Sequence, residues 1–172
     1  MFLSLTEREP NNPRLWNFLA SSIWLKVIYE QEKLNLESFS GARLGGARSN
    51  DLVSDEREGR LREVLAHAIS VAGAKLEADP DNIDALYATG VAYGTLASFE
   101  ATVKRSYLAA NRAASRAREA HLRVLTLDPS FNDARLTIGT IDYAVGVLPS
   151  LVRMIIGVLG IRGDKEGGIK QL

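Results

Sequence analysis

The sequence has no cysteine and only two histidines. The lack of cysteine excludes disulfide bonds, thiol catalysis and thiolate metal sites, and it suits the cytoplasm and the periplasm equally. His67 and His121 have no second metal ligand three or four residues further along, whereas a site built on one helix needs such a partner. We therefore expect two structural or surface histidines, no metal and no cofactor.

The chain also lacks an excess of charge of either sign, with 21 basic and 21 acidic residues. A balanced chain has no basic footprint for nucleic acid or for an anionic membrane, so we expect neither partner. The longest apolar segment, residues 147–161, is about 15 residues long, whereas a bilayer-spanning helix takes about 20. We predict a buried helix there, with an exposed partner or membrane-surface patch as the alternative. The first seven residues carry no basic, apolar signal pattern, so we expect no signal peptide in this chain.

An internal repeat is the strongest signal in the sequence. Asp79-Pro80, followed by Ala85 and Gly90, recurs 49 residues later (128 − 79) as Asp128-Pro129, followed by Ala134 and Gly139. A fainter copy lies 70 residues upstream (79 − 9), where Glu9-Pro10 is followed by Trp16 and Ala20. Repetition at this scale predicts stacked supersecondary units in a single domain over residues 1–172.

Each repeated unit reads as helix, Asp-Pro turn, helix. Apolar residues recur at spacings of three, four and seven up to each Asp-Pro, and proline then stops the helix. Asn82 or Asp81, and Asn132, stand where the next helix needs an N-cap. Gly90 and Gly139 fall inside helices, where glycine is unfavourable, so we expect a neighbouring backbone to approach closely there. The predicted helices cover 13–36, 59–78, 83–103, 107–127 and 132–147, with a helix tail at 1–8, a Gly-rich insertion loop at about 39–58, and an incomplete last helix from about 164.

This unit resembles the tetratricopeptide repeat (TPR). Pro80, Gly90 and Tyr93 match that family's pattern, as do Pro129 and Ile138-Gly139, and residues 163–169 look like its inter-helix turn. The repeats are longer than the family's usual length of about 34 residues. The resemblance implies an all-α fold, an α-α superhelix of stacked antiparallel helix pairs. It also implies that this chain is a fragment of a longer repeat protein, with partial repeats at both ends.

In the TPR family the first helix of each pair lines a concave, partner-binding groove. The resemblance carries this role onto eight positions of three helices, with Gly94 beside them. An extended peptide or a helix would fit this mixture of aromatic, aliphatic and small polar residues. The alternative is that Trp24 and Tyr143 are core residues of long helices. The candidate groove residues are Asn17, Ser21, Trp24, Tyr87, Val91, Leu136, Thr140 and Tyr143.

No acid, base and nucleophile occur in an arrangement that predicts catalysis, so we do not expect an enzyme. The expected function is a non-catalytic scaffold that binds a protein or peptide, with homo-oligomers possible through exposed ends. The alternative is a small-ligand binding module of a bacterial envelope or transport system. That alternative draws on the long helices and the Gly-rich segment Gly41–Arg48, which lacks the strand and the Gly-Lys-Ser/Thr ending of a phosphate-binding loop.

Two further patterns have simpler explanations. Arg105, Arg112, Arg116 and Arg123 fall near one helical stripe, which predicts a solvated face or, alternatively, a surface for an acidic partner. Arg162-Gly163-Asp164 spells an adhesion tripeptide, but its residues are those of an inter-helix turn.

Overall fold

The computed structural model describes residues 1–30 and 53–146, and within these ranges every regular element is helical. The prediction of an all-α fold is confirmed. The predicted features at 147–161, Arg162-Gly163-Asp164 and Gly41–Arg48 lie outside the described residues. The elements are α1 (Phe2–Arg8), α2 (Pro13–Glu30), α4 (Asp55–Ala78), α5 (Ile83–Phe99), the π-helix η2 (Glu100–Lys104), α6 (Tyr107–Leu127) and α7 (Asn132–Gly146).

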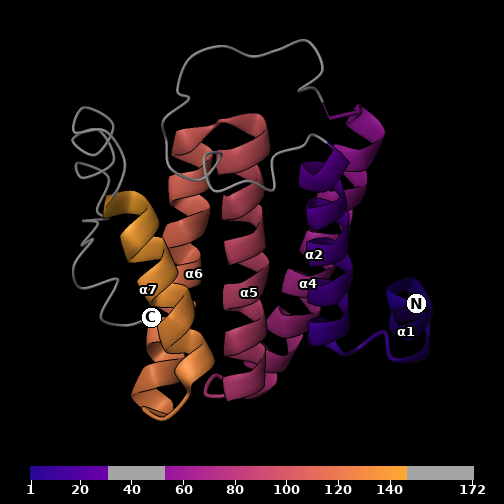
Figure 1. The fold of residues 1–172 in the computed structure, drawn as a ribbon. Helices are drawn as coiled ribbons and strands as arrows, with labels where there is room; N and C mark the ends of the chain where they lie inside the picture. The colour runs from indigo at the N-terminus through magenta and orange to yellow at the C-terminus, as the bar shows by residue number, and fades with distance from the viewer. Residues whose placement is uncertain (31–52, 147–172) are drawn as a thin grey trace.

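The helices pack alongside one another, and α2, α4 and α5 form a group in which each helix contacts the other two (Figure 1). Helix α4 packs on α2 and α5, α6 packs on α5 and α7, and α2 also contacts α5. Short turns between α4 and α5 and between α6 and α7 make these neighbours antiparallel. In the predicted repeat, α2, α5 and α7 correspond to the first helices of successive pairs, and α4 and α6 correspond to the second helices.

Three turns in the chain are built by the same hydrogen bonds. The Asp79 N–H donates to the Lys75 carbonyl (2.9 Å), and the Asn82 N–H donates back to the Asp79 carbonyl (3.1 Å). The equivalent pairs of bonds recur at Asp128 (2.7 and 3.2 Å) and at Glu9 (3.0 and 3.1 Å). The side-chain carboxylates of Asp79 and Asp128 each also accept a hydrogen bond from the backbone N–H two residues ahead. This local hydrogen bond is the reason that Asp is favoured at turns. The three sequence copies therefore share one backbone geometry at this turn.

Two helix boundaries differ from the sequence prediction. Helix α4 begins at Asp55, four residues before the expected start, because the Ser54 hydroxyl accepts from the Arg57 N–H (3.4 Å) and acidic residues fill the first turn. The predicted insertion loop therefore ends before residue 55. The predicted helix at 83–103 is α5 followed by η2, and Arg105 ends this run with a left-handed φ of 53°.

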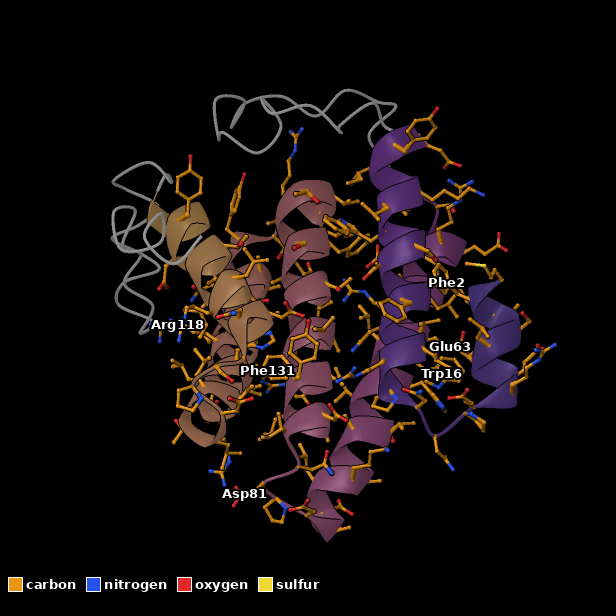
Figure 2. The ribbon with its side chains drawn as sticks, turned by 60° about the horizontal axis from the view of Figure 1, so that its bottom comes forward. Phe2, Trp16, Glu63, Asp81, Arg118 and Phe131 are labelled. Carbon is orange, nitrogen blue, oxygen red and sulfur yellow. The ribbon has the colours of Figure 1, made fainter. Side chains whose placement is uncertain are left out.

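The core has a larger and a smaller part. The larger lies between α2, α4 and α5, where aliphatic side chains surround Phe99, which is fully buried. The smaller joins α5, α6 and α7 through Leu86, Val124 and Ala134, with Phe131 packed against it. Figure 2 shows Phe131 at the turn into α7. Many of the buried residues of α5 and α6 are alanine, and small side chains let helices approach closely.

Candidate functional site

The candidate groove residues differ in exposure from helix to helix. On α7, Leu136 (51%) and Tyr143 (38%) are exposed, as is Thr140 between them. These three lie at spacings of four and three, so they form one stripe along α7. On α2, Ser21 and Trp24 are half-buried, and on α5 so are Tyr87 and Val91. Of the predicted residues, those on α7 are the most accessible to a partner.

Asn17 has a structural role in the stack. Its side chain is buried (4% exposed), and its Nδ2 donates to the Ala88 carbonyl on α5 (2.8 Å). This bond joins α2 to α5. A side chain so placed is unavailable to a partner, so the groove prediction does not fit this position. Trp24 packs against the larger core, and its indole N–H lies 3.4 Å from the Thr102 hydroxyl.

Tyr87 lies at the junction of α2, α5 and α6. Its ring centroid is 5.4 Å from that of His121 and 5.0 Å from that of Phe131, and the Arg14 guanidinium carbon is 5.9 Å from it. Burial, with the nearby Asp133 carboxylate, raises the pKa of the Tyr87 phenol. The ring of Tyr87 therefore packs against neighbouring aromatic rings while part of the side chain stays exposed to solvent.

Gly94 faces open space. A Cβ built on it would have no heavy atom within 4 Å. Gly94 is three residues beyond Val91 on the candidate face of α5, so a side chain added at this position would extend into open space. The exposed stripe on α7 offers a partner contact area, and the position of Gly94 on α5 leaves space for one.

Gly90, one helical turn before Gly94, is tightly enclosed instead. A Cβ there would lie 2.6 Å from Nε2 of His121. The predicted close approach is therefore made by a side chain of α6 and not by a backbone. His121 is fully buried, and neither ring nitrogen has a hydrogen-bond partner in the described structure. Burial lowers the pKa of His121 to about 4.

His67 differs from His121 in its surroundings. It is exposed on α4, with its ring centroid 4.0 Å from that of Trp16. Each histidine thus packs against an aromatic residue of a neighbouring helix, His67 against Trp16 of α2 and His121 against Tyr87 of α5. In residues 1–30 and 53–146 no group of three His, Asp or Glu side chains could hold a metal ion.

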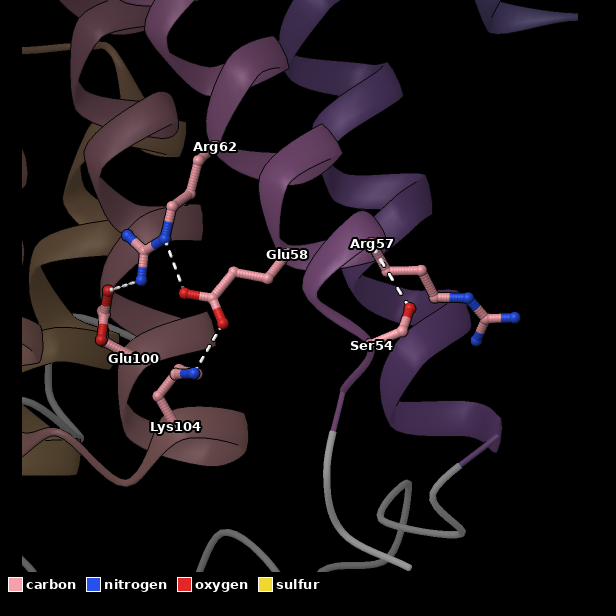
Figure 3. Close-up of polar contacts among 6 residues, drawn as sticks. All are labelled: Ser54, Arg57, Glu58, Arg62, Glu100 and Lys104. Atoms are coloured by element: carbon pink, nitrogen blue, oxygen red, sulfur yellow. Dashed lines mark hydrogen bonds and ion pairs between the residues drawn. The ribbon is translucent and has the colours of Figure 1, made fainter.

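A charged cluster that the sequence analysis missed joins α4 to η2 (Figure 3). Arg62 donates to Glu58 (2.8 Å) and to Glu100 (2.6 Å), and Lys104 donates to Glu58 (2.6 Å). The Lys104 hydrogen bond lowers the pKa of Glu58, and Arg62 lowers it further. The i,i+4 spacing of Glu58 and Arg62 could have revealed one pair. The other two pairs depend on the π-helix, which carries Lys104 and places the carboxylate of Glu100 in the interior (7% exposed).

The cluster gives a prediction with a matched control. Arg62→Ala leaves the carboxylate of Glu100 buried and unpaired, so we expect it to lower the free energy of unfolding by about 1–2 kcal/mol, discounted because Arg62 is itself partly exposed. Arg60→Ala breaks only an exposed pair with Glu63, so we expect a change within about 0.5 kcal/mol. Urea denaturation measures both. Equal effects would contradict a stabilising role for the cluster.

An open cleft of about 640 Å³ lies at the turn before α2. Arg8, Lys75 and Arg14 line it together with the carboxylates of Glu9 and Asp84. Arg14 forms an ion pair with Asp84. The cleft is of a size that suits small ligands, and its lining carries both signs of charge.

The predicted arginine stripe is partly used within the protein. Arg116 donates to the Tyr93 hydroxyl (3.0 Å) and lies over its ring, and Arg123 pairs with Asp81 (2.5 Å). Arg118, between them in the sequence, pairs with the buried Asp142 of α7. These arginines connect α6 to its neighbours, which favours a structural role for this part of the stripe.

No protein-family model, no curated protein and no solved structure matches this sequence. None of the helices in the described ranges is both long enough and apolar enough to cross a membrane.

Proposed function

We propose that this chain is a non-catalytic, TPR-like scaffold that binds a protein or peptide along the first helices of its pairs. The observation that carries the proposal is the exposed stripe Leu136, Thr140 and Tyr143 on α7, which lies on candidate groove positions. Gly94, three residues beyond Val91 on α5, leaves open space beside a second set of these positions. Exposed aromatic and aliphatic side chains on a helix suit contact with a partner.

Three observations support the TPR-like arrangement itself. The turns at Glu9, Asp79 and Asp128 have the same backbone hydrogen bonds. Helix α2 contacts α5 directly, with the Asn17 side chain bonded to the α5 backbone. Small residues at the helix crossings, Ala20 and Gly90, are buried. Stacking of helix pairs in this way would generate a superhelix with the first helices on one side.

Gly94→Leu tests the groove directly, because it adds a large side chain to the candidate face of α5 at a position where a Cβ meets no atom within 4 Å. The matched control is Gly73→Leu on α4, where a Cβ also meets nothing within 4 Å. We expect the proteins that the wild-type chain captures to bind Gly94→Leu at least about tenfold more weakly. This change in affinity corresponds to a loss of about 1.4 kcal/mol or more of binding free energy. They should be retained with Gly73→Leu. Undiminished capture by Gly94→Leu would contradict the proposed groove.

The cleft beside α2 favours a second candidate, a small-ligand binding module of an envelope or transport system. Three cationic side chains converge on it, and within the described structure Arg8 and Lys75 are in no ion pair. Thermal-shift measurements with citrate and with phosphate test this function. Saturable stabilisation that disappears in Lys75→Ala would support it, and the same flat response from wild type and variant would reject it.

A further inference from the structure

The buried face of α6 holds little apolar surface. Its buried residues are five alanines, two polar residues and Val124. Helix α4 instead buries Leu61, Val64 and Leu65 together with two alanines. The hydrophobic contribution to folding grows with the apolar area that is buried. We therefore expect α6 to be held in place less strongly than α4.

The two polar residues on this face, Asn111 and His121, add to that difference. Oδ1 of Asn111 and both ring nitrogens of His121 are buried without a hydrogen-bond partner in the described structure. A buried polar group without a partner destabilises the folded state. Separation of α6 from α5 would give these atoms water as a partner, so they favour local opening of this contact.

His121 lies where α6 meets α5. Its ring packs so closely on Gly90 that a Cβ added there would lie 2.6 Å from Nε2, and its centroid is 5.4 Å from that of Tyr87. The ring therefore fills the α5–α6 contact itself. It cannot gain a proton and become hydrated while that contact stays closed.

Ionisable side chains around this contact have partners of their own. They are Arg14 of α2 and Asp133 of α7, which both act on Tyr87, and the pairs Arg116–Tyr93, Arg118–Asp142 and Arg123–Asp81. None of these groups is a cause of the lowered pKa of His121, which burial produces. In the described structure no carboxylate therefore stabilises a charged ring in the closed contact.

The larger core lies apart from this contact. It is formed by α2, α4, α5 and η2, and none of its described residues comes from α6 or α7. Both tryptophans of the chain, Trp16 and Trp24, pack against it. An opening of α6 can therefore leave this core, and its tryptophan fluorescence, unchanged.

We propose that the α5–α6 contact is an acid-sensitive switch, in which protonation of His121 separates α6 from α5 while the core of α2, α4 and α5 stays folded. The pKa of His121 is about 4 in the closed contact and returns toward 6.5 once the ring is hydrated. The equilibrium constant for opening therefore rises about 50-fold between pH 7.5 and pH 4.5. This switch does not depend on the function proposed above.

Amide hydrogen exchange of the full chain at pH 7.5 and pH 4.5, corrected for the intrinsic exchange rates, tests the proposal. At pH 4.5 the amides of α6 are expected to be at least about tenfold less protected than those of α4, with unchanged tryptophan fluorescence. Between the two pH values α6 should lose about 50-fold more protection in the wild type than in His121→Leu. The control Asn111→Ala changes a buried polar residue of the same face that does not titrate, so it should lose as much protection as the wild type.

Two results would overturn the proposal. The first is equal protection of α6 and α4 in the wild type at pH 4.5, because α6 would then be exposed only when the whole chain unfolds. This comparison needs no variant, so it holds even if His121→Leu fails to fold. The second is the same loss of α6 protection in the wild type and in a folded His121→Leu, because the acid response would then come from other groups.

Discussion

Gly90→Ala is expected to lower the free energy of unfolding by about 2 kcal/mol, because overpacking costs about 1–3 kcal/mol and exceeds the helix propensity gained. The new methyl carbon would lie 2.6 Å from the His121 ring, which is itself fully buried and cannot move aside without disturbing α6. Gly94→Ala in the same helix meets no atom within 4 Å, so we expect it to raise the free energy of unfolding by up to about 1 kcal/mol. The same substitution four residues apart thus has opposite signs.

Urea denaturation of both variants measures this difference of about 3 kcal/mol. His121→Ala supplies the control, because the clash disappears when the ring is removed. Gly90→Ala should therefore cost less in the His121→Ala background than in the wild type, and the double-mutant cycle gives a coupling energy. Equal effects of Gly90→Ala and Gly94→Ala would show that the α5–α6 contact is not as close as described.

The second large effect is a loss of stability in acid that His121 causes. Its pKa is about 4 in the folded protein, lowered by burial from 6.5. The unfolded chain therefore binds the proton more tightly, so neutral His121 contributes stability that is fully present above about pH 6.5. That contribution falls as the pH drops, and about 3 kcal/mol is lost once the pH is below about 4.

The comparison of wild type with His121→Leu isolates this effect from the titration of carboxylates, which both proteins share. Chemical denaturation between pH 7.5 and pH 4 should show the wild type losing about 3 kcal/mol more than the variant. A wild type and a His121→Leu variant with parallel pH profiles would contradict the burial of a neutral imidazole.

The sequence predicted the parts of the fold that depend on local chemistry. Proline after Asp79 and Asp128 ends a helix whatever surrounds it, and an Asn at position 82 caps the next one through its own side chain. Gly90 was correctly identified as a position of close approach, since a mid-helix glycine needs a packing reason. The identity of its neighbour depends on the register between α5 and α6, which periodicity does not determine.

The sequence could not reveal features that depend on contacts between helices. The π-helix η2 turns Glu100 inward, and its pairing with Arg62 arises from a neighbouring helix. The groove assignment transferred positions by family register. It could not foresee that the Asn17 amide would bond to the α5 backbone, whereas Leu136, Thr140 and Tyr143 are exposed.

The central claim is that α2 and α5 lie side by side, and cysteine crosslinking tests it most directly. The chain has no cysteine of its own, so two introduced thiols report on a single pair of sites. Arg14→Cys with Asp84→Cys places thiols where α2 and α5 form an exposed ion pair. Arg14→Cys with Glu119→Cys, on the exposed surface of α6, is the control. A short bismaleimide should crosslink the first pair of cysteines within the monomer and leave the control pair uncrosslinked. Equal crosslinking of both pairs, or of neither, would contradict the contact between α2 and α5.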